Sequence, residues 1–282
     1  MTIQTELESK KQNLVEILEG LGQVAVAFSG GVDSSYLLAV CIDVLGPEHV
    51  LAVTVDSPLL PRAELDTARE VAHTLGARHL IVPFNELELP AVRANPPDRC
   101  YYCKRARFEA LLTIARSSGD LRVLHGENAD DHLDYRPGAR AARELGVRAP
   151  LAEAGLTKAE IRTLSQARGL PTWNHPPAAC LASRVPYGTP LTREALARIE
   201  QAENALHALL PALQLRVRDH YPLARIELPP EAFARIAEEP LRAEIVAQLH
   251  AAGYLYVTLD LDGYRMGSLN EELTDRVARQ PV

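Results

Sequence analysis

The chain has 282 residues, a formal net charge of −7, 47% hydrophobic residues and 5% aromatic residues. The length favours two domains, and the acidic balance argues against nucleic-acid binding, for which a basic surface is expected. No apolar run has the length of a membrane span, and the polar N-terminal residues lack the apolar region of a secretory signal. Four cysteines, at positions 41, 100, 103 and 180, do not make a secreted disulfide framework in a chain this long, so we expect a cytoplasmic protein.

Apolar strands and helices alternate along the first half of the chain. The pattern predicts helices at 3–21, 36–45, 62–75 and 99–116, and strands at 24–28, 50–55, 79–82 and 122–125. This alternation is typical of an α/β fold with a doubly wound parallel sheet, in which ligands bind at the carboxyl ends of the strands. We therefore expect one such domain over residues 1–150, with Ser29, Asp56 and Gly126 along one crevice.

The composition shifts near residue 150, and we expect a smaller α+β domain over residues 151–282. Thr157 and Glu160 form the sequence pattern of a capping box at the start of a helix over 157–168. Prolines make 171–190 a loop. The remaining pattern predicts helices at 192–209 and 231–251, and strands at 215–218, 224–228 and 254–261.

The most informative motif lies between the first strand and its helix and reads S-G-G-V-D-S-S. A glycine pair there lets backbone N–H groups approach an anion, and the helix N-terminus adds the positive end of its dipole. No lysine follows the glycines, so the motif is not a Walker loop. A glycine-rich turn without function is the alternative, which the complete motif disfavours. The residues that we expect to cradle the phosphates of ATP are Ser29, Gly30, Gly31, Val32, Asp33, Ser34 and Ser35.

A second polar loop, G-E-N-A-D-D, follows the strand at 122–125. Gly126 allows close approach of the backbone, and the carboxylates, including Asp131, could hold Mg²⁺ or shape a ribose pocket. In isolation the segment would be read as an acidic surface turn.

The cysteines differ in their surroundings. Cys41 lies on an apolar helix face and is expected in the core. Cys100 and Cys103 form a C-x-x-C pair at a helix start, which suits a redox pair, metal or cluster ligands, or a structural pair. Cys180 lies in a proline-stiffened loop where Arg184 would favour the nucleophilic thiolate; a small buried hydrophobe is the alternative.

Arginines near the C-terminus suit an anionic ligand. Arg216 and Arg218 alternate on a predicted strand and so share a face, which suits a phosphate or a carboxylate. A solvated basic face is the alternative. Arg265, between two glycines, is either a further anion contact or part of an exit turn.

These motifs resemble known families at two levels. The 29–35 segment resembles the PP-loop of N-type ATP pyrophosphatases. From residue 29 to 271 the chain resembles the LarE-type ATP-dependent sulfur transferases, which make the nickel-pincer nucleotide cofactor of lactate racemase. The matching strings are S-G-G-V-D-S-S, R-C-Y-Y-C-K, G-E-N-A-D-D, P-P-A-A-C-L-A-S-R-V-P-Y-G, R-V-R-D-H, A-R-I-E and G-Y-R-M-G-S-L-N-E.

The resemblance implies a reaction. ATP, with Mg²⁺ held by Asp33, would adenylate a carboxylate of pyridinium-3,5-biscarboxylic acid mononucleotide, and a sulfur on Cys180 would displace AMP. Cys180 would then either give up its own sulfur or, as we favour, join Cys100 and Cys103 on a 4Fe-4S cluster that carries a transferable sulfide.

The resemblance also implies roles around the substrate and an assembly. Arg216 and Arg218 would hold the substrate phosphate, whereas Ser183, Arg184 and Glu203 would lie near the reacting carboxyl. The family forms homo-oligomers.

Two other readings remain open from the residues. A PP-loop tRNA thiolase combines similar motifs, but the acidic balance and the absence of an added basic domain count against it. A nucleotide-binding redox regulator would bind ATP without substrate-dependent exchange of pyrophosphate.

Overall fold

The computed structural model describes residues 3–133, 137–176, 179–211, 213–265 and 267–270. The packing of the chain divides it into two compact units: residues 1–86 with 98–178, and residues 87–97 with 179–282. This division differs from the expected boundary at residue 150, because Leu151, Leu156 and Ile161 are buried in the same core as the first unit's helices. Each unit is described by itself.

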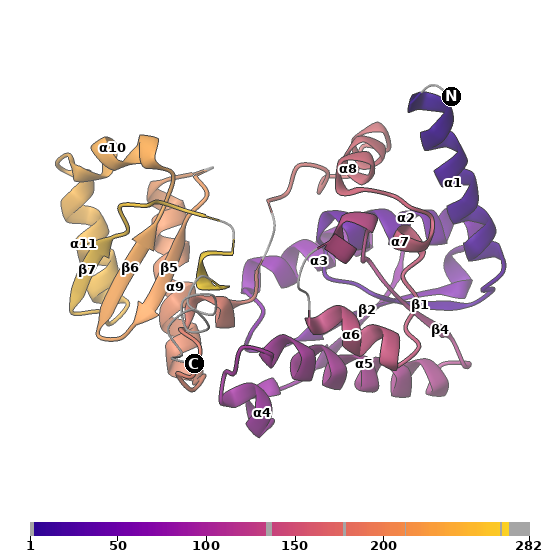
Figure 1. The fold of residues 1–282 in the computed structure, drawn as a ribbon, viewed down its shortest axis with the longest axis horizontal. Helices are drawn as coiled ribbons and strands as arrows, with labels where there is room; N and C mark the ends of the chain where they lie inside the picture. Colours follow the sequence, from indigo (N-terminus) through magenta and orange to yellow (C-terminus); the bar gives the residue numbers. More distant parts are fainter. Residues whose placement is uncertain (1–2, 134–136, 177–178, 212, 266, 271–282) are drawn as a thin grey trace, which may run out of the picture. The chain divides into compact units, whose positions relative to one another are not determined.

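The first unit is built on a four-stranded parallel sheet (Figure 1). The strand order is β3-β2-β1-β4, and Val24 pairs with Val50 on one side and with Arg122 on the other. The strands are β1 (Val24–Ala27), β2 (Val50–Asp56), β3 (Arg78–Pro83) and β4 (Arg122–His125). The helices are α1 (Ile3–Glu19), α2 (Val32–Leu45), α3 (Arg62–Thr74), α5 (Arg99–Ser117), α6 (Pro137–Glu144), α7 (Pro150–Glu153) and α8 (Lys158–Ala167).

Helices cover both faces of this sheet. Side chains of a strand alternate between its two faces, and accordingly Val24 and Val26 pack into a core with α1, α2, α3, α7 and α8. Ala25 points to the opposite core, which contains Phe108 of α5 and Ala142 of α6. The predicted doubly wound α/β fold is therefore confirmed.

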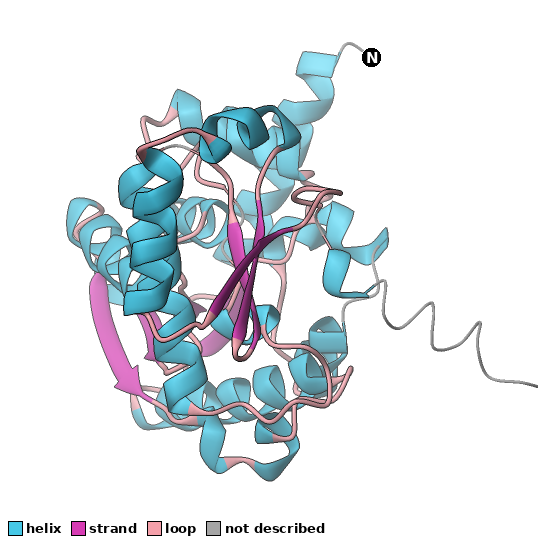
Figure 2. Cartoon of the chain, turned by 90° about the vertical axis from the view of Figure 1, so that its left-hand side faces the viewer, coloured by secondary structure: helices cyan, strands magenta, loops and turns pink. Residues whose placement is uncertain are grey.

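The second unit has a three-stranded mixed sheet. Its strands are β5 (Arg216–His220), β6 (Leu223–Glu227) and β7 (Tyr256–Leu259), with β5 antiparallel and β7 parallel to the central β6. Its helices are α4 (Pro90–Arg93), α9 (Arg193–Leu209), α10 (Phe233–Ala237) and α11 (Leu241–Ala251). Figure 2 draws the helices of the chain in cyan and its strands in magenta. The prediction of one helix over 231–251 is wrong, because Pro240 lacks an N–H donor and separates α10 from α11.

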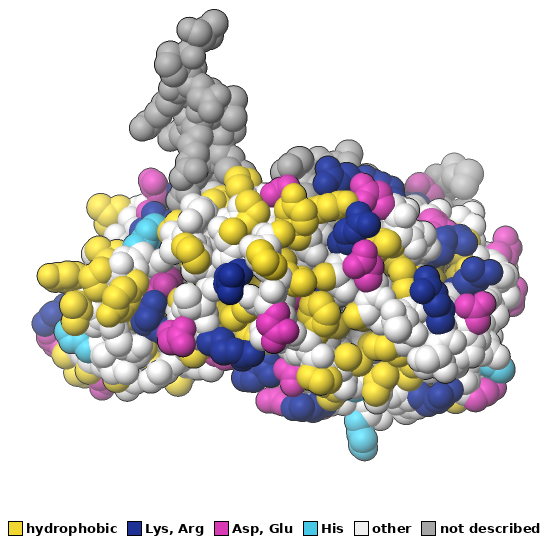
Figure 3. Space-filling view, turned by 90° about the horizontal axis from the view of Figure 1, so that it is seen from below, with side chains coloured by type: hydrophobic (Ala, Val, Ile, Leu, Met, Phe, Trp, Pro, Cys, Tyr) yellow, Lys and Arg dark blue, Asp and Glu magenta, His cyan; other side chains and the backbone are white. Residues whose placement is uncertain are grey.

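Two surface features bear on possible partners. None of the described helices is both long and apolar enough to cross a membrane. On the face drawn in Figure 3, basic and acidic side chains are interspersed among apolar ones.

Candidate functional site

The 29–35 motif forms the turn from β1 into α2. Gly30 has φ 77°, and a Cβ there would lie 2.8 Å from Ala68 Cα of α3, so only glycine fits this close approach. The turn is tied by Ser29 Oγ, which lies 3.0 Å from Ser34 Oγ, and by Ser34 Oγ, which donates to the Gly31 carbonyl at 3.1 Å. The 14-residue helix α2 thus begins just after the carboxyl end of β1. Such a helix end attracts phosphate through its N–H groups and its dipole.

The second loop lies against the first. A Cβ on Gly126 would be 2.9 Å from the backbone nitrogen of Ser34, so this glycine permits contact between the two loops. The Asn128 side chain is 3.5 Å from Asp33 Oδ2, and its backbone N–H donates to Asp131 Oδ2 at 3.1 Å. The structure therefore brings together the two loops that the sequence predicted at neighbouring strand ends.

Asp33 carries the main electrostatic feature of this site. Lys158 Nζ lies 2.9 and 2.8 Å from its two carboxylate oxygens. Burial raises the pKa of Asp33 and the nearby Asp131 carboxylate acts in the same direction, whereas Lys158 opposes both. The largely enclosed carboxylate is thus stabilised by a cation beside it. Mg²⁺ prefers carboxylate oxygens, so the charge and donor chemistry of this position fit the expected metal.

Lys158 was not identified from the sequence. It is the first residue of α8, which the confirmed capping box of Thr157 and Glu160 begins. Its backbone N–H also donates to Asp130 Oδ2 of the second loop at 2.8 Å. In the sequence it is only a lysine at the start of a helix. Its proximity to Asp33 depends on a contact between residues 125 positions apart.

Asp56 lies at the end of β2, as expected, but its carboxylate is engaged. Arg62 Nη1 is 2.5 Å from Asp56 Oδ1, and Arg62 also donates to the Ser57 and Leu60 carbonyls. Both side chains of the ion pair are partly exposed. The pair fastens the start of α3 to the end of β2.

The C-x-x-C pair begins α5. Cys100 and Cys103 are partly buried, and the buried Arg99 places Nη2 3.9 Å from Cys100 Sγ. Cys41 is fully buried and burial raises the pKa of its thiol to about 12, which confirms its place in the core. Across the described parts of the chain, no group of three or more His, Cys, Asp or Glu side chains is arranged to hold a metal ion. Cys180 belongs to the second unit, whereas Cys100 and Cys103 belong to the first.

In the second unit, Cys180 lies immediately before a short 3₁₀ helix, Leu181–Arg184. The guanidinium of Arg184 forms a paired contact with Glu203 of α9, at 3.0 and 2.7 Å. Arg184 also donates to the Cys180 carbonyl at 3.0 Å, and Ser183 Oγ donates to the same carbonyl at 2.8 Å. Glu203 Oε1 accepts in addition the N–H of Val217 at 2.9 Å. A buried ion pair therefore fixes the backbone of the Cys180 turn to α9 and β5.

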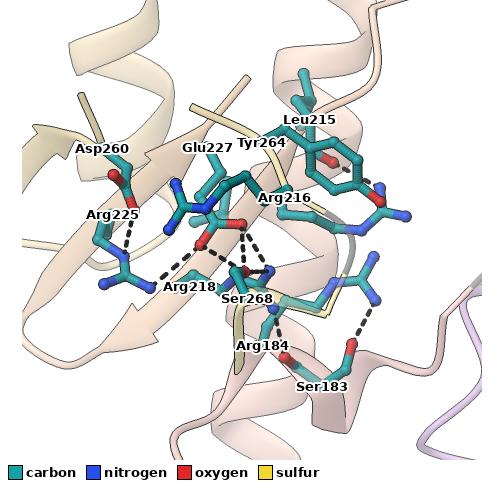
Figure 4. Close-up of polar contacts among 12 residues, drawn as sticks. Ser183, Arg184, Leu215, Arg216, Arg218, Arg225, Glu227, Asp260, Tyr264 and Ser268 are labelled. Atoms are coloured by element: carbon teal, nitrogen blue, oxygen red, sulfur yellow. Dashed lines mark hydrogen bonds and ion pairs between the residues drawn. The ribbon is translucent and has the colours of Figure 1, made fainter. Parts of the chain in front are cut away.

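Arg218 reaches the same turn from β5. Its Nη1 donates to the Ser183 carbonyl at 2.7 Å, and its Nη2 bonds Glu227 at 2.6 Å and Ser268 Oγ at 2.9 Å (Figure 4). Arg216 donates to the Leu215 carbonyl, and its guanidinium lies 5.4 Å from the Tyr264 ring centroid.

Both arginines of β5 are buried. Burial, together with the nearby Arg184 guanidinium, lowers the pKa of Arg216. The shared face was predicted, but the reading of a solvated basic face is wrong.

Some residues around these arginines were missed or differ from expectation. Glu227 is fully buried and ion-paired to both Arg218 and Arg225, and no local pattern marks it as different from other strand glutamates. Ser268 joins the same network from the far C-terminal segment. Arg265 contacts Gly263 and Asp262 in its own turn.

The chain is similar to known proteins over the residues described above. The NAD synthase family matches residues 7–188. The chain is 41% identical over 95% of its length to the pyridinium-3,5-bisthiocarboxylic acid mononucleotide synthase of Lactiplantibacillus plantarum, of which it covers 96%. It is 44% identical over 95% of its length to the uncharacterized protein slr1717 of Synechocystis, of which it covers 99%. It is 27% identical to the uncharacterized protein MJ0830 of Methanocaldococcus jannaschii, over 94% of this chain and 99% of that protein.

The family match covers the strands of the first unit, the two loops and Lys158, and the similarity to the synthase extends through the second unit. The chain therefore belongs to the PP-loop ATP pyrophosphatases and, among them, to the LarE-type family of ATP-dependent sulfurtransferases that includes the pyridinium-3,5-bisthiocarboxylic acid mononucleotide synthase.

Proposed function

We propose that this enzyme adenylates a carboxylate of pyridinium-3,5-biscarboxylic acid mononucleotide and converts it into a thiocarboxylate through Cys180, as a step toward the nickel-pincer cofactor of lactate racemase. The observation that carries the proposal is the clamped Cys180 turn. The buried Arg184 donates to the Cys180 carbonyl, and the buried Arg218 donates to the Ser183 carbonyl. A thiol on a turn held from two elements is suited to a fixed attack position.

The first unit would perform the activation. The N-terminus of α2 and residues 29–35 would bind the β- and γ-phosphates of ATP, and Asp33 would hold Mg²⁺. Asp131 and Gly126 would complete the nucleotide pocket. A substrate carboxylate oxygen attacks the α-phosphorus, the bond to the β-phosphate oxygen breaks, and pyrophosphate leaves as the acyl adenylate forms.

The second unit would deliver sulfur. A sulfur carried by Cys180 attacks the acyl carbon, and AMP leaves with the bonding electron pair. Ser183, Arg184 and Glu203 would lie at the reacting carboxyl. Their role here is to keep the turn fixed, because the Arg184–Glu203 contact is buried and paired.

Charge in the second unit supports a phosphate-bearing substrate. The cluster around the Cys180 turn has three buried guanidiniums, of Arg184, Arg216 and Arg218, and two buried carboxylates, of Glu203 and Glu227. The third buried carboxylate among the unit's described residues, that of Asp219, is paired with Arg198. The Arg218 Nε has no hydrogen-bond partner among the described residues. A cluster with excess buried positive charge and an unpartnered donor is suited to a phosphate dianion.

The source of the transferred sulfur has two forms. In the sacrificial form, the Cβ–S bond of Cys180 breaks as a base removes the Cα proton, so the substrate keeps the sulfur and residue 180 becomes dehydroalanine. In the form that we favour, Cys100, Cys103 and Cys180 would hold a 4Fe-4S cluster, and such a cluster would supply a transferable sulfide. Cysteine thiolates are the ligands that such clusters take, and these three cysteines are partly buried, whereas Cys41 lies in the core.

Mass spectrometry of the chain after anaerobic turnover tests the proposal. Intact Cys180 with bound iron and many turnovers on added sulfide is the expected result. Dehydroalanine at 180 without iron would exclude the cluster and keep Cys180 as donor. Full activity of Cys180→Ala would exclude both forms, and Cys41→Ala, which changes only a core cysteine, is the matched control.

We further propose that the enzyme acts as a homo-oligomer in the cytoplasm. Four free cysteines support a reducing compartment. Sedimentation of the purified enzyme tests the assembly, and a monomer would exclude it.

A further inference from the structure

The ammonium group of Lys158 occupies the position where a cation would bind Asp33. It lies 2.9 and 2.8 Å from the two carboxylate oxygens. The Asp33 side chain is 20% exposed, and the Lys158 side chain is 34% exposed. The carboxylate is therefore largely enclosed, whereas the lysine stem borders solvent and has room to change direction.

The backbone of Lys158 is fixed although its side chain can move. The capping box of Thr157 and Glu160 sets the start of α8. The Lys158 N–H donates to Asp130 Oδ2, which ties this helix start to the second loop. If the ammonium group moves, it therefore stays close to the two nucleotide loops.

Metal and ammonium compete for the same oxygens. Mg²⁺ binds carboxylate oxygens directly and tolerates little deviation from octahedral geometry. The Lys158 ammonium lies within hydrogen-bond distance of both Asp33 oxygens and therefore opposes Mg²⁺ binding. It repels the metal as a like charge, and it occupies lone pairs that the metal would use. In the chain without nucleotide, the Asp33 carboxylate is already neutralised, and so a divalent cation alone gains little there.

A polyphosphate changes this balance. It brings negative charge to the N-terminus of α2, next to Asp33. The displaced ammonium can then bind phosphate oxygens, while the metal takes the carboxylate.

We propose that Lys158 is an exchangeable counter-ion, which holds Asp33 in the nucleotide-free enzyme and transfers to the polyphosphate when the metal arrives. This inference rests on the proposed role of residues 29–35 and Asp33 in binding Mg²⁺ and ATP. Its consequence is positive coupling: metal and polyphosphate bind well together, and metal alone binds weakly. Coupling between two ligands is reciprocal and commonly amounts to about 5- to 150-fold.

The test measures Mn²⁺ binding to the full chain by electron paramagnetic resonance, without nucleotide. Lys158→Met is expected to bind Mn²⁺ about tenfold more tightly than the wild type, because the competing ammonium is gone. Lys158→Arg keeps the charge and is expected to bind Mn²⁺ as weakly as the wild type. Lys11→Met is the matched control, since Lys11 lies exposed on α1 and pairs with Glu8.

A non-hydrolysable ATP analogue provides the second measurement. It is expected to strengthen Mn²⁺ binding strongly in the wild type and only weakly in Lys158→Met. Equal Mn²⁺ affinities of wild type and Lys158→Met, with binding lost in Asp33→Asn, would overturn the exchange alone. Tight Mn²⁺ binding that persists in the double variant Asp33→Asn/Lys158→Met would instead overturn the metal role of Asp33 in the proposed function, and the exchange with it.

Discussion

Removing the carboxylate of Glu203 should destabilise the second unit strongly. Glu203 accepts two hydrogen bonds from Arg184 and one from the Val217 N–H, and both members of the ion pair are buried. In Glu203→Ala the guanidinium would stay buried near Arg216 and Arg218 without its counter-ion. Breaking a buried pair by removing one partner costs about 3–5 kcal/mol. We expect a loss of this size in the free energy of unfolding.

Urea denaturation followed by circular dichroism measures this loss. Gln201→Ala, an exposed position on the same helix, is the matched control and should change stability by about 0.5 kcal/mol or less. The double variant Arg184→Leu/Glu203→Leu removes both charges, and should be less destabilised than Glu203→Ala. A loss below about 1 kcal/mol in Glu203→Ala, the value typical of exposed pairs, would refute the inference that this ion pair is buried and mutually dependent.

Three further variants probe other parts of the enzyme. Asp33→Asn should abolish pyrophosphate release, measured with a coupled pyrophosphate assay, while its circular dichroism stays that of the wild type; wild-type activity would remove Asp33 from the reaction. Burial, with Lys104 nearby, lowers the pKa of His125 to about 3, so its contribution to stability is full above pH 6.5 and declines as the pH falls from about 6.5 toward about 3. The wild type should therefore lose about 2 kcal/mol more than His125→Gln between pH 7 and pH 5 in urea unfolding, and parallel pH profiles would contradict this. Asn95→Ala should cost about 1–3 kcal/mol and speed hydrogen exchange at residues 185–191, because the Asn95 amide donates to three carbonyls of that segment; unchanged exchange would contradict this role.

Local patterns predicted the first unit well. The strand at 122–125 was predicted with its observed bounds, and β1, β2 and α5 differ from prediction by one residue at one end. The reason is physical: a strand buried on both faces must be continuously apolar, and its helices must be amphipathic. The turn at Gly30 was predictable as well, because only glycine combines a positive φ with close contact to another helix.

The boundary between the two units and the placement of residues 87–97 depend on contacts between distant residues, which no local sequence pattern indicates. Residues 151–178 look like the start of a new unit in composition, but Leu156 and Ile161 bury against α2. Residues 87–97 pack with the second unit, where the Asn95 side chain binds carbonyls of the 185–189 segment. One helix was predicted over residues 231–251 although Pro240 is visible in the sequence, and the structure has two helices there.

The cation beside Asp33 is the clearest example of a site feature that the local sequence did not reveal. The sequence motif contains no lysine, and on that ground the loop differs from a Walker loop, whose lysine follows its glycines. The structure nevertheless places a lysine at Asp33, from the first turn of a helix that begins 125 residues later. A lysine inside the loop would be fixed beside the phosphates whether or not a metal is present. A lysine on a separate helix, with its backbone fastened to the second loop through Asp130, can instead bind the carboxylate before the nucleotide arrives and the phosphates afterwards.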